Sequence, residues 1–171
     1  MSLNRIAQHE VEPLPRWARR ALAARCVRRA RALIQPPPAQ AGVLDEALVR
    51  LDQATGAGSA GDDLADVAAR AYTLALDNVD AGGDDESSVV TCMVAHAAAF
   101  AAEAATLADS KQAAHLVAQS VDFAIHAYRL ARRASAEPAL VAMRADLERL
   151  QGAAASWDQA TPVPGTFFPR L

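Results

Sequence analysis

The chain has 171 residues, of which 52% are hydrophobic and 22% are charged, and its formal net charge is −3. This composition excludes a disordered chain, and the length is that of one globular domain, which we expect to span residues 1–171. The opening residues MSLNRIAQHE lack the apolar core of a secretory signal, and the longest apolar run, 89–102, is largely alanine, so we expect no membrane span and a cytoplasmic location.

Three helices are predicted in the first half of the chain. The first covers approximately 15–35 and is stopped by the three prolines that follow it. The second covers 43–54, where apolar residues recur at helical spacing, and the GAGSAG stretch ends it. The third covers 62–78, with aspartates at its start that can cap free amides and oppose the positive end of the helix dipole.

Two longer helices are predicted next. The fourth covers 88–108, with Ser87 or Ser88 as its N-cap. The fifth covers 110–134 and is the longest; Asp109 followed three residues later by a glutamine resembles a capping box.

The sixth predicted helix covers 136–151 and ends at Gly152. Residues 156–171 contain three prolines and are predicted to form a non-helical tail. No segment alternates with period two, and alanine is the commonest residue, so helices can pack closely. The sequence therefore predicts an all-α fold, a single-domain, alanine-rich bundle of about six helices with an extended tail rich in proline and phenylalanine.

Charge is separated along the chain. Residues 1–35 contain eight arginines and two glutamates, whereas residues 45–86 contain eleven acidic residues and two arginines. We expect the arginines of 15–35 to lie against the acidic region within the fold. The alternative is that they bind phosphate, which would make the protein a nucleic-acid binder; because they spread around most of the helix circumference, we regard nucleic acid as the weaker hypothesis.

Large side chains form one narrow stripe along the predicted helix 88–108. The stripe consists of Val89, Met93, His96, Phe100 and Leu107. We expect it to point inward, so that His96 and Glu103, on its flank, form a buried polar pair. The alternative is that His96 is a metal ligand or a general base.

A polar strip is predicted along one face of 110–134, while apolar side chains take the rest. The strip consists of His115, Gln119, Asp122, His126, Arg129 and Arg133. We interpret it first as a solvated strip and second as a partner-binding strip.

Catalytic motifs are absent from the sequence: it has no Walker loop, GxGxxG, GxSxG or HExxH. We therefore predict no catalytic residue, no metal and no cofactor. Cys26 and Cys92, without CxxC spacing or a nearby histidine, are expected to be small buried hydrophobic residues. An alternative class is a helical metal-binding protein or enzyme, for which the candidate ligands are His96, Glu103, His115, Asp122 and His126, although the paired ExxH motifs of di-iron bundles are missing.

Four segments carry a resemblance to a known group of proteins. They are LAARCVRRARALI, VAHAAAFAAEAA, MRADLERL and WDQATPVPGTFFP, in this order. The pattern resembles bacterial all-α proteins grouped with the immunity proteins of polymorphic toxin systems. The resemblance implies a cytoplasmic, non-catalytic protein that binds and neutralises a cognate toxin domain.

The tail is expected to fold back over a groove between helices, with the alternative that it anchors a partner. Its candidate anchors are Trp157, Phe167 and Phe168. A protein partner is thus the predicted ligand, and the sequence leaves a homo-oligomer open.

Overall fold

The computed structural model describes residues 5–57, 63–80, 85–132 and 136–154. Every regular element in these ranges is a helix, which confirms the all-α prediction. The described part contains seven helices rather than about six. They are α1 (Gln8–Val11), α2 (Arg16–Arg31), α3 (Pro38–Ala57), α4 (Asp63–Asp80), α5 (Glu86–Thr106), α6 (Ser110–Arg132) and α7 (Glu137–Ala154).

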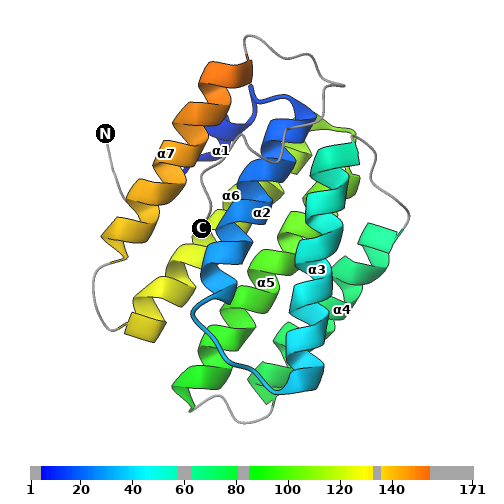
Figure 1. The fold of residues 1–171 in the computed structure, drawn as a ribbon, viewed down its shortest axis with the longest axis vertical. Coiled ribbons are helices and arrows are strands. Elements are labelled where there is room, and N and C mark those ends of the chain that lie inside the picture. The colour runs from blue at the N-terminus through cyan, green and yellow to red at the C-terminus, as the bar shows by residue number, and fades with distance from the viewer. Residues whose placement is uncertain (1–4, 58–62, 81–84, 133–135, 155–171) are drawn as a thin grey trace.

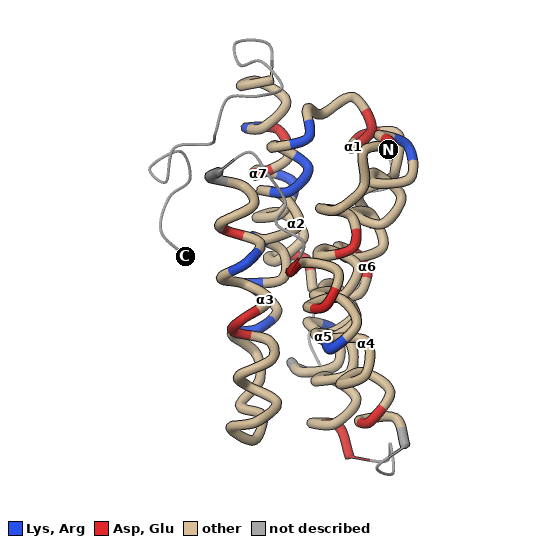
Figure 2. Tube along the Cα trace, turned by 90° about the vertical axis from the view of Figure 1, so that its right-hand side faces the viewer, with Lys and Arg blue, Asp and Glu red and all other residues tan. Residues whose placement is uncertain are grey.

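The six long helices form two layers, which Figure 1 shows one behind the other and Figure 2 shows edge-on. One layer has α2 between α3 and α7, and the second has α5 between α4 and α6. The layers meet where α2 packs on α5 and α6 and where α3 packs on α4 and α5. Helix α1 lies against α6, and its Glu10 forms an ion pair with Arg144 of α7, so α1 is at the edge where the two layers meet.

Alanine makes up most of the buried surface of α5. On α5 the fully buried residues include Ala97, Ala98, Ala101 and Ala102, each with no exposed surface. Small side chains let helix axes approach closely, and the hydroxyl of Ser120 on α6 reaches the carbonyl oxygen of Ala97 at 2.7 Å. Close packing of alanine, expected from composition, thus accounts for the part of the core around α5, while large side chains such as Trp17, Leu22 and Leu51 fill other parts.

Enlarging one of these alanines tests the close approach of α5 and α6. Ala97→Leu is expected to lower the free energy of unfolding by about 1–3 kcal/mol, because overpacking forces side chains and backbone to shift. The exposed Arg129 on α6 supplies the control, since Arg129→Ala should change stability by less than about 0.5 kcal/mol. Urea unfolding followed by circular dichroism measures both; equal effects would show that Ala97 is not in a tight contact.

Several predicted helix limits need correction. Helix α3 begins at Pro38, five residues before the predicted start at 43, because proline is tolerated in a first turn, where its missing N–H would have no partner. The same prolines that stop α2 therefore also start α3, which continues to Ala57, into the GAGSAG stretch.

The predicted end of the last helix is also wrong. Helix α7 passes through Gly152 to Ala154. Glycine disfavours a helix by only about 1 kcal/mol relative to alanine, so it does not end one by itself. The short α1 was not predicted at all.

The predicted N-cap is wrong for α5 and confirmed for α6. The N-cap of α5 is Asp85, whose carboxylate accepts from the amide of Ser88 at 3.2 Å, so the prediction of Ser87 or Ser88 as the cap is wrong. The predicted cap of α6 is confirmed, because the Asp109 carboxylate accepts from the Gln112 amide at 2.6 Å.

Candidate functional site

The stripe of large side chains on α5 lies at the margin of the core, where Met93, Phe100 and Leu107 pack against it. Val89, Met93, His96, Phe100 and Leu107 are all partly exposed, as is Glu103. The opposite side of α5 packs on α2 and α3 through alanine, so the stripe lies on the side that faces away from that layer. The expectation that it points inward is right only in part, because these side chains pack on the core from the side of α4 and α6 and each keeps some exposed surface.

Aromatic rings from three helices meet over this stripe. The ring of His96 is stacked on that of Phe123 from α6, with centroids 4.8 Å apart, and Phe100 is stacked on Phe123 at 5.4 Å. Tyr72 of α4 contacts Phe100 edge-on at 5.5 Å. Such arrangements stabilise aromatic pairs beyond their area of burial, so the three helices present one joined cluster.

His96 and Glu103 have different hydrogen-bond partners. Nδ1 of His96 donates to the carbonyl oxygen of Cys92 at 3.1 Å, and Sγ of Cys92 lies 3.5 Å from the same nitrogen. The Glu103 carboxylate accepts from the Tyr72 hydroxyl at 3.0 Å. Both side chains are half-buried, and the structure does not pair them as the sequence led us to expect.

The environment of these groups determines their protonation. Burial, and then the hydrogen bond and negative charge of Glu103, raise the pKa of Tyr72 to about 12, so the hydroxyl remains a donor at neutral pH. Burial also raises the pKa of the Cys92 thiol. His96 lies beside Cys92, so the prediction that Cys92 has no nearby histidine is wrong. The thiol is nevertheless a poor nucleophile, because it is buried and neutral.

The apolar surface extends from the stripe onto both neighbouring helices. Leu76 and Val79 lie on the same side of α4 as Tyr72, four and seven residues on, and are 59% and 55% exposed. Leu130 lies seven residues after Phe123 on α6 and is 38% exposed. These are three of the five exposed large hydrophobic residues in the described ranges.

We call this surface the outer face. It consists of Tyr72, Leu76, Val79, Val89, Met93, His96, Phe100, Glu103, Phe123 and Leu130. Among the described elements, only α1 lies outside the two layers, and it packs at the edge between α6 and α7, so none of them covers the outer face. Glu103 is its single carboxylate. Tyr72, Leu76 and Val79 were not singled out from the sequence, although their spacing of four and three residues marks one side of a helix.

The polar strip of α6 lies at the surface. His115, His126 and Arg129 are exposed, while Gln119 and Asp122 are half-buried. The Asp122 carboxylate lies 3.4 Å from the guanidinium of Arg5. Nδ1 of His126 donates to the carbonyl oxygen of Asp122 at 2.8 Å.

The side chain of Arg133 lies outside the described residues, as do Trp157, Phe167 and Phe168 of the predicted tail anchor. In the ranges that the structure describes, no three histidine, cysteine, aspartate or glutamate side chains come together in a group that could hold a metal ion. The five candidate ligands divide between α5, with His96 and Glu103, and α6, with the other three.

The arginines of α2 have two kinds of partner. Arg28 and Arg31 pair with Asp52 and Asp45 of α3, as the charge separation predicted. Arg25 and Arg29 pair instead with one buried carboxylate, Asp146 of α7, which lies outside the acidic region 45–86. The prediction that the acidic region supplies the counter-charge is therefore right for two arginines and wrong for these two.

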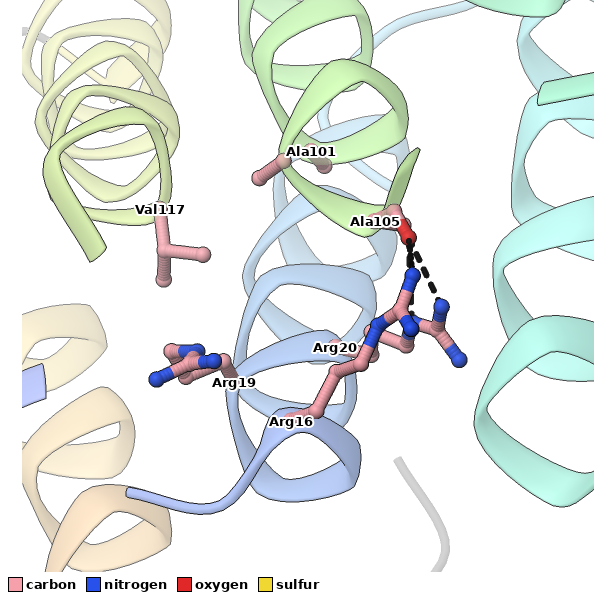
Figure 3. A pocket seen from close by; sticks show the side chains of 7 residues that line it. Arg16, Arg19, Arg20, Ala101, Ala105 and Val117 are labelled. Atoms are coloured by element: carbon pink, nitrogen blue, oxygen red, sulfur yellow. Dashed lines mark hydrogen bonds between the residues drawn. The ribbon is translucent and has the colours of Figure 1, made fainter. Parts of the chain in front are cut away.

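The remaining arginines of α2 bind backbone carbonyl groups. Arg20 donates to Ala105 O from Nε at 3.2 Å and from Nη2 at 2.7 Å, and to Ala54 O from Nη1 at 3.0 Å. Arg16 reaches Ala105 O, whereas Arg19 extends the other way and donates to Leu14 O at 2.9 Å (Figure 3). Burial, with the neighbouring positive charges, lowers the pKa of Arg20 to about 10, so it stays charged at neutral pH.

The space between these three arginines is too small for a water molecule. Each arginine of α2 thus has a partner within the fold, which leaves less of its guanidinium surface for a phosphate.

Helix α5 is the one described helix that is long and apolar enough to cross a membrane by length and composition alone. In its most apolar stretch, 67% of the residues are buried against other helices. A core helix of a soluble protein has the same properties, so this is consistent with a soluble protein.

Comparisons of the chain with protein-family models, with curated proteins and with solved structures find no match.

Proposed function

We propose that this protein is a non-catalytic protein-binding module whose binding surface is the outer face. The most specific version of this proposal is that the protein is an immunity protein, which neutralises a cognate toxin domain by binding it, as the resemblance of the sequence implies. The location that goes with it is the cytoplasm.

One observation carries the proposal: partly or fully exposed apolar and aromatic side chains of α4, α5 and α6 lie on one side of their layer, and no described element covers them. Tyr72, Phe100 and Phe123 are three of the few aromatic residues in a chain with 5% aromatic content, and all three lie on the outer face. Soluble proteins rarely expose a contiguous apolar surface unless it binds something. Aromatic residues are also enriched where proteins bind one another.

The chemistry of the outer face defines the kind of occupant. Apart from the Glu103 carboxylate and the His96 ring, its side chains are apolar or aromatic, and Tyr72 already uses its hydroxyl. Because burying charge without a partner is costly, the matching surface must itself be mainly apolar. A folded toxin domain with an apolar patch meets this requirement.

The other two function classes have less support. A metal centre would need ligands that the described part of the chain does not bring together. A nucleic-acid site on α2 would need guanidinium groups that instead bind carboxylates and carbonyl groups. The histidines of the α6 strip leave a partner-binding role open beside the outer face.

The test uses one exposed leucine and a matched exposed valine. If a toxin gene lies immediately upstream of this gene, as the proposal requires, Leu76→Asp should reduce the affinity for that toxin by at least about tenfold, because a carboxylate would be buried without a partner. Val141→Asp is the control, since Val141 is 60% exposed on α7, in the other layer. Isothermal titration with the purified toxin domain, and survival of cells that co-express it, measure the effect.

Both variants should melt like the wild type, because surface changes rarely alter stability by more than about 0.5 kcal/mol. Full protection by Leu76→Asp would reject the outer face as the binding surface. The absence of any toxin gene beside this one, or of any binding by the wild type, would reject the immunity role.

A further inference from the structure

Glu103 is an unusual residue on the outer face. Its carboxylate lies at one end of the aromatic cluster, half-buried, and the hydroxyl of Tyr72 holds one of its oxygens at 3.0 Å. No cation of the described residues lies within ion-pair distance of it, whereas seven other acids in these ranges pair with arginines. The fold orients this charge and does not neutralise it.

A partner that covers the outer face removes water from the Glu103 carboxylate and must supply a group that compensates its charge. A wholly apolar partner would strip water from the carboxylate and leave only the tyrosine hydroxyl as a donor, which disfavours binding. A partner with a guanidinium or ammonium group at that point would form a charge-assisted hydrogen bond in a site from which water is largely excluded.

The shape of the face also restricts the partner. The α5 stripe is one row of side chains at spacings of three and four residues, flanked by the Tyr72–Leu76–Val79 row of α4 and by Phe123 and Leu130 of α6. From residue 89 to Glu103 the row is about 21 Å long, the length of about four helical turns. A long apolar strip of this kind fits the apolar side of a helix, which places its own anchors at the same spacing.

We infer that the outer face binds an amphipathic helix of a partner protein, whose apolar side chains cover the α5 stripe and whose arginine or lysine pairs with Glu103. This inference rests on the proposed protein-binding function and names the partner's chemistry. Electrostatic complementarity at Glu103 sets the direction and specificity of binding, and the apolar row supplies most of the affinity.

Two other occupants fit less well. A second copy of the chain would present its own outer face, which offers histidine but no arginine or lysine to Glu103. A membrane surface would place anionic headgroups near a carboxylate, and the outer face has no basic residue to attract them.

The experiment uses two labelled synthetic peptides of 18 residues. They share one stripe of leucines and differ at a single terminal position, which is arginine in the first and glutamate in the second. Fluorescence anisotropy with the full chain should show about tenfold tighter binding of the arginine peptide, as expected for one charge-assisted pair. In Glu103→Gln the difference should fall below about twofold. Tyr72→Phe keeps the ring and removes the orienting hydroxyl, and should reduce the difference without removing it.

Glu148→Gln is the matched control, because Glu148 is an exposed glutamate on α7, in the other layer; it should leave the preference unchanged. Equal binding of the two peptides to the wild type, or a preference that survives in Glu103→Gln, would overturn the inference. Two other results would also overturn it. The first is that the protein binds vesicles of phosphatidylcholine and phosphatidylserine but neither peptide. The second is that light scattering shows a stable dimer, which Leu76→Asp dissociates.

The inference and the proposed function fail in different ways. If Leu76→Asp weakens both peptides but Glu103→Gln does not change the preference, the outer face binds proteins and only the role of Glu103 is wrong. If Leu76→Asp weakens neither peptide and still protects cells against the upstream toxin, the proposed binding surface is wrong as well.

Discussion

Replacing Asp146 with alanine is expected to lower the free energy of unfolding by about 3–5 kcal/mol, because it leaves two arginines buried without their counter-ion. The Asp146 Oδ2 atom lies 2.8 Å from Arg25 Nε and 2.5 Å from Arg29 Nη1. All three side chains are largely buried between α2 and α7. Since α7 packs mainly on α2, this cluster is a polar link that holds α7 on the bundle, beside the pair of Arg144 with Glu10.

A second acid that pairs with α2 gives the control for Asp146→Ala. The pair of Arg28 and Asp52 is solvent-exposed, with side chains 44% and 50% accessible, so Asp52→Ala should cost less than about 1 kcal/mol. Guanidinium unfolding followed by circular dichroism compares the two variants at pH 7. Losses of equal size would mean that the buried cluster contributes no more than a surface ion pair.

Local signals predicted the helices well. Helix periodicity, prolines and caps act within a few residues, so the order of the six long helices and the Asp109 cap follow from the sequence alone. Helix α1 has only four residues and no periodic pattern. Contacts far along the chain hold it, such as the bond from Gln8 to the carbonyl oxygen of Lys111 and the pair of Glu10 with Arg144, and the sequence does not reveal such contacts.

The candidate site was predicted in part. His96, Phe100 and Glu103 were chosen from the sequence, but they were assigned to the core, because a helical wheel ranks positions by hydrophobic size. In this chain the buried side of α5 is mainly alanine, with Val90, Cys92 and Val94 among its larger members, so the largest side chains of the helix do not mark its most buried side. The orientation of a helix that is apolar on all sides depends on its neighbours, which a single helix does not show.

The charge pattern of the sequence predicted only some of the partners of the α2 arginines. Opposite charge on α3 predicted the pairs of Arg28 and Arg31, because carboxylates are visible in a sequence. Backbone carbonyl groups are present at every residue, so nothing in the sequence marks those of Ala54 and Ala105 as acceptors for Arg20. They become acceptors only because two helices end beside α2.

Arg20→Met should therefore lower the free energy of unfolding by about 2–4 kcal/mol, because it removes three hydrogen bonds to the carbonyl groups of Ala54 and Ala105, and Arg16 offers Ala105 O only one long bond in their place, at 3.5 Å. Ala105 and Ala54 lie in the last turns of α5 and α3, where carbonyl groups have no amide of their own helix to bind. Methionine keeps most of the buried volume, so the change isolates the lost hydrogen bonds and charge.

Arg28→Met is the matched control for Arg20→Met, because Arg28 is an arginine of the same helix with an exposed ion pair, and it should cost less than about 1 kcal/mol. Arg20→Lys should recover only part of the loss, since an ammonium group lacks the planar fork that reaches both carbonyl groups at once. Thermal and urea unfolding measure the three variants. If Arg20→Met and Arg28→Met were equally stable, the contacts of Arg20 would not join the ends of α3 and α5 to α2, and the arginines of α2 would be free for another role. If Arg20→Lys matched the wild type, charge alone would account for the contribution of Arg20, and the geometry of its two carbonyl contacts would be unimportant.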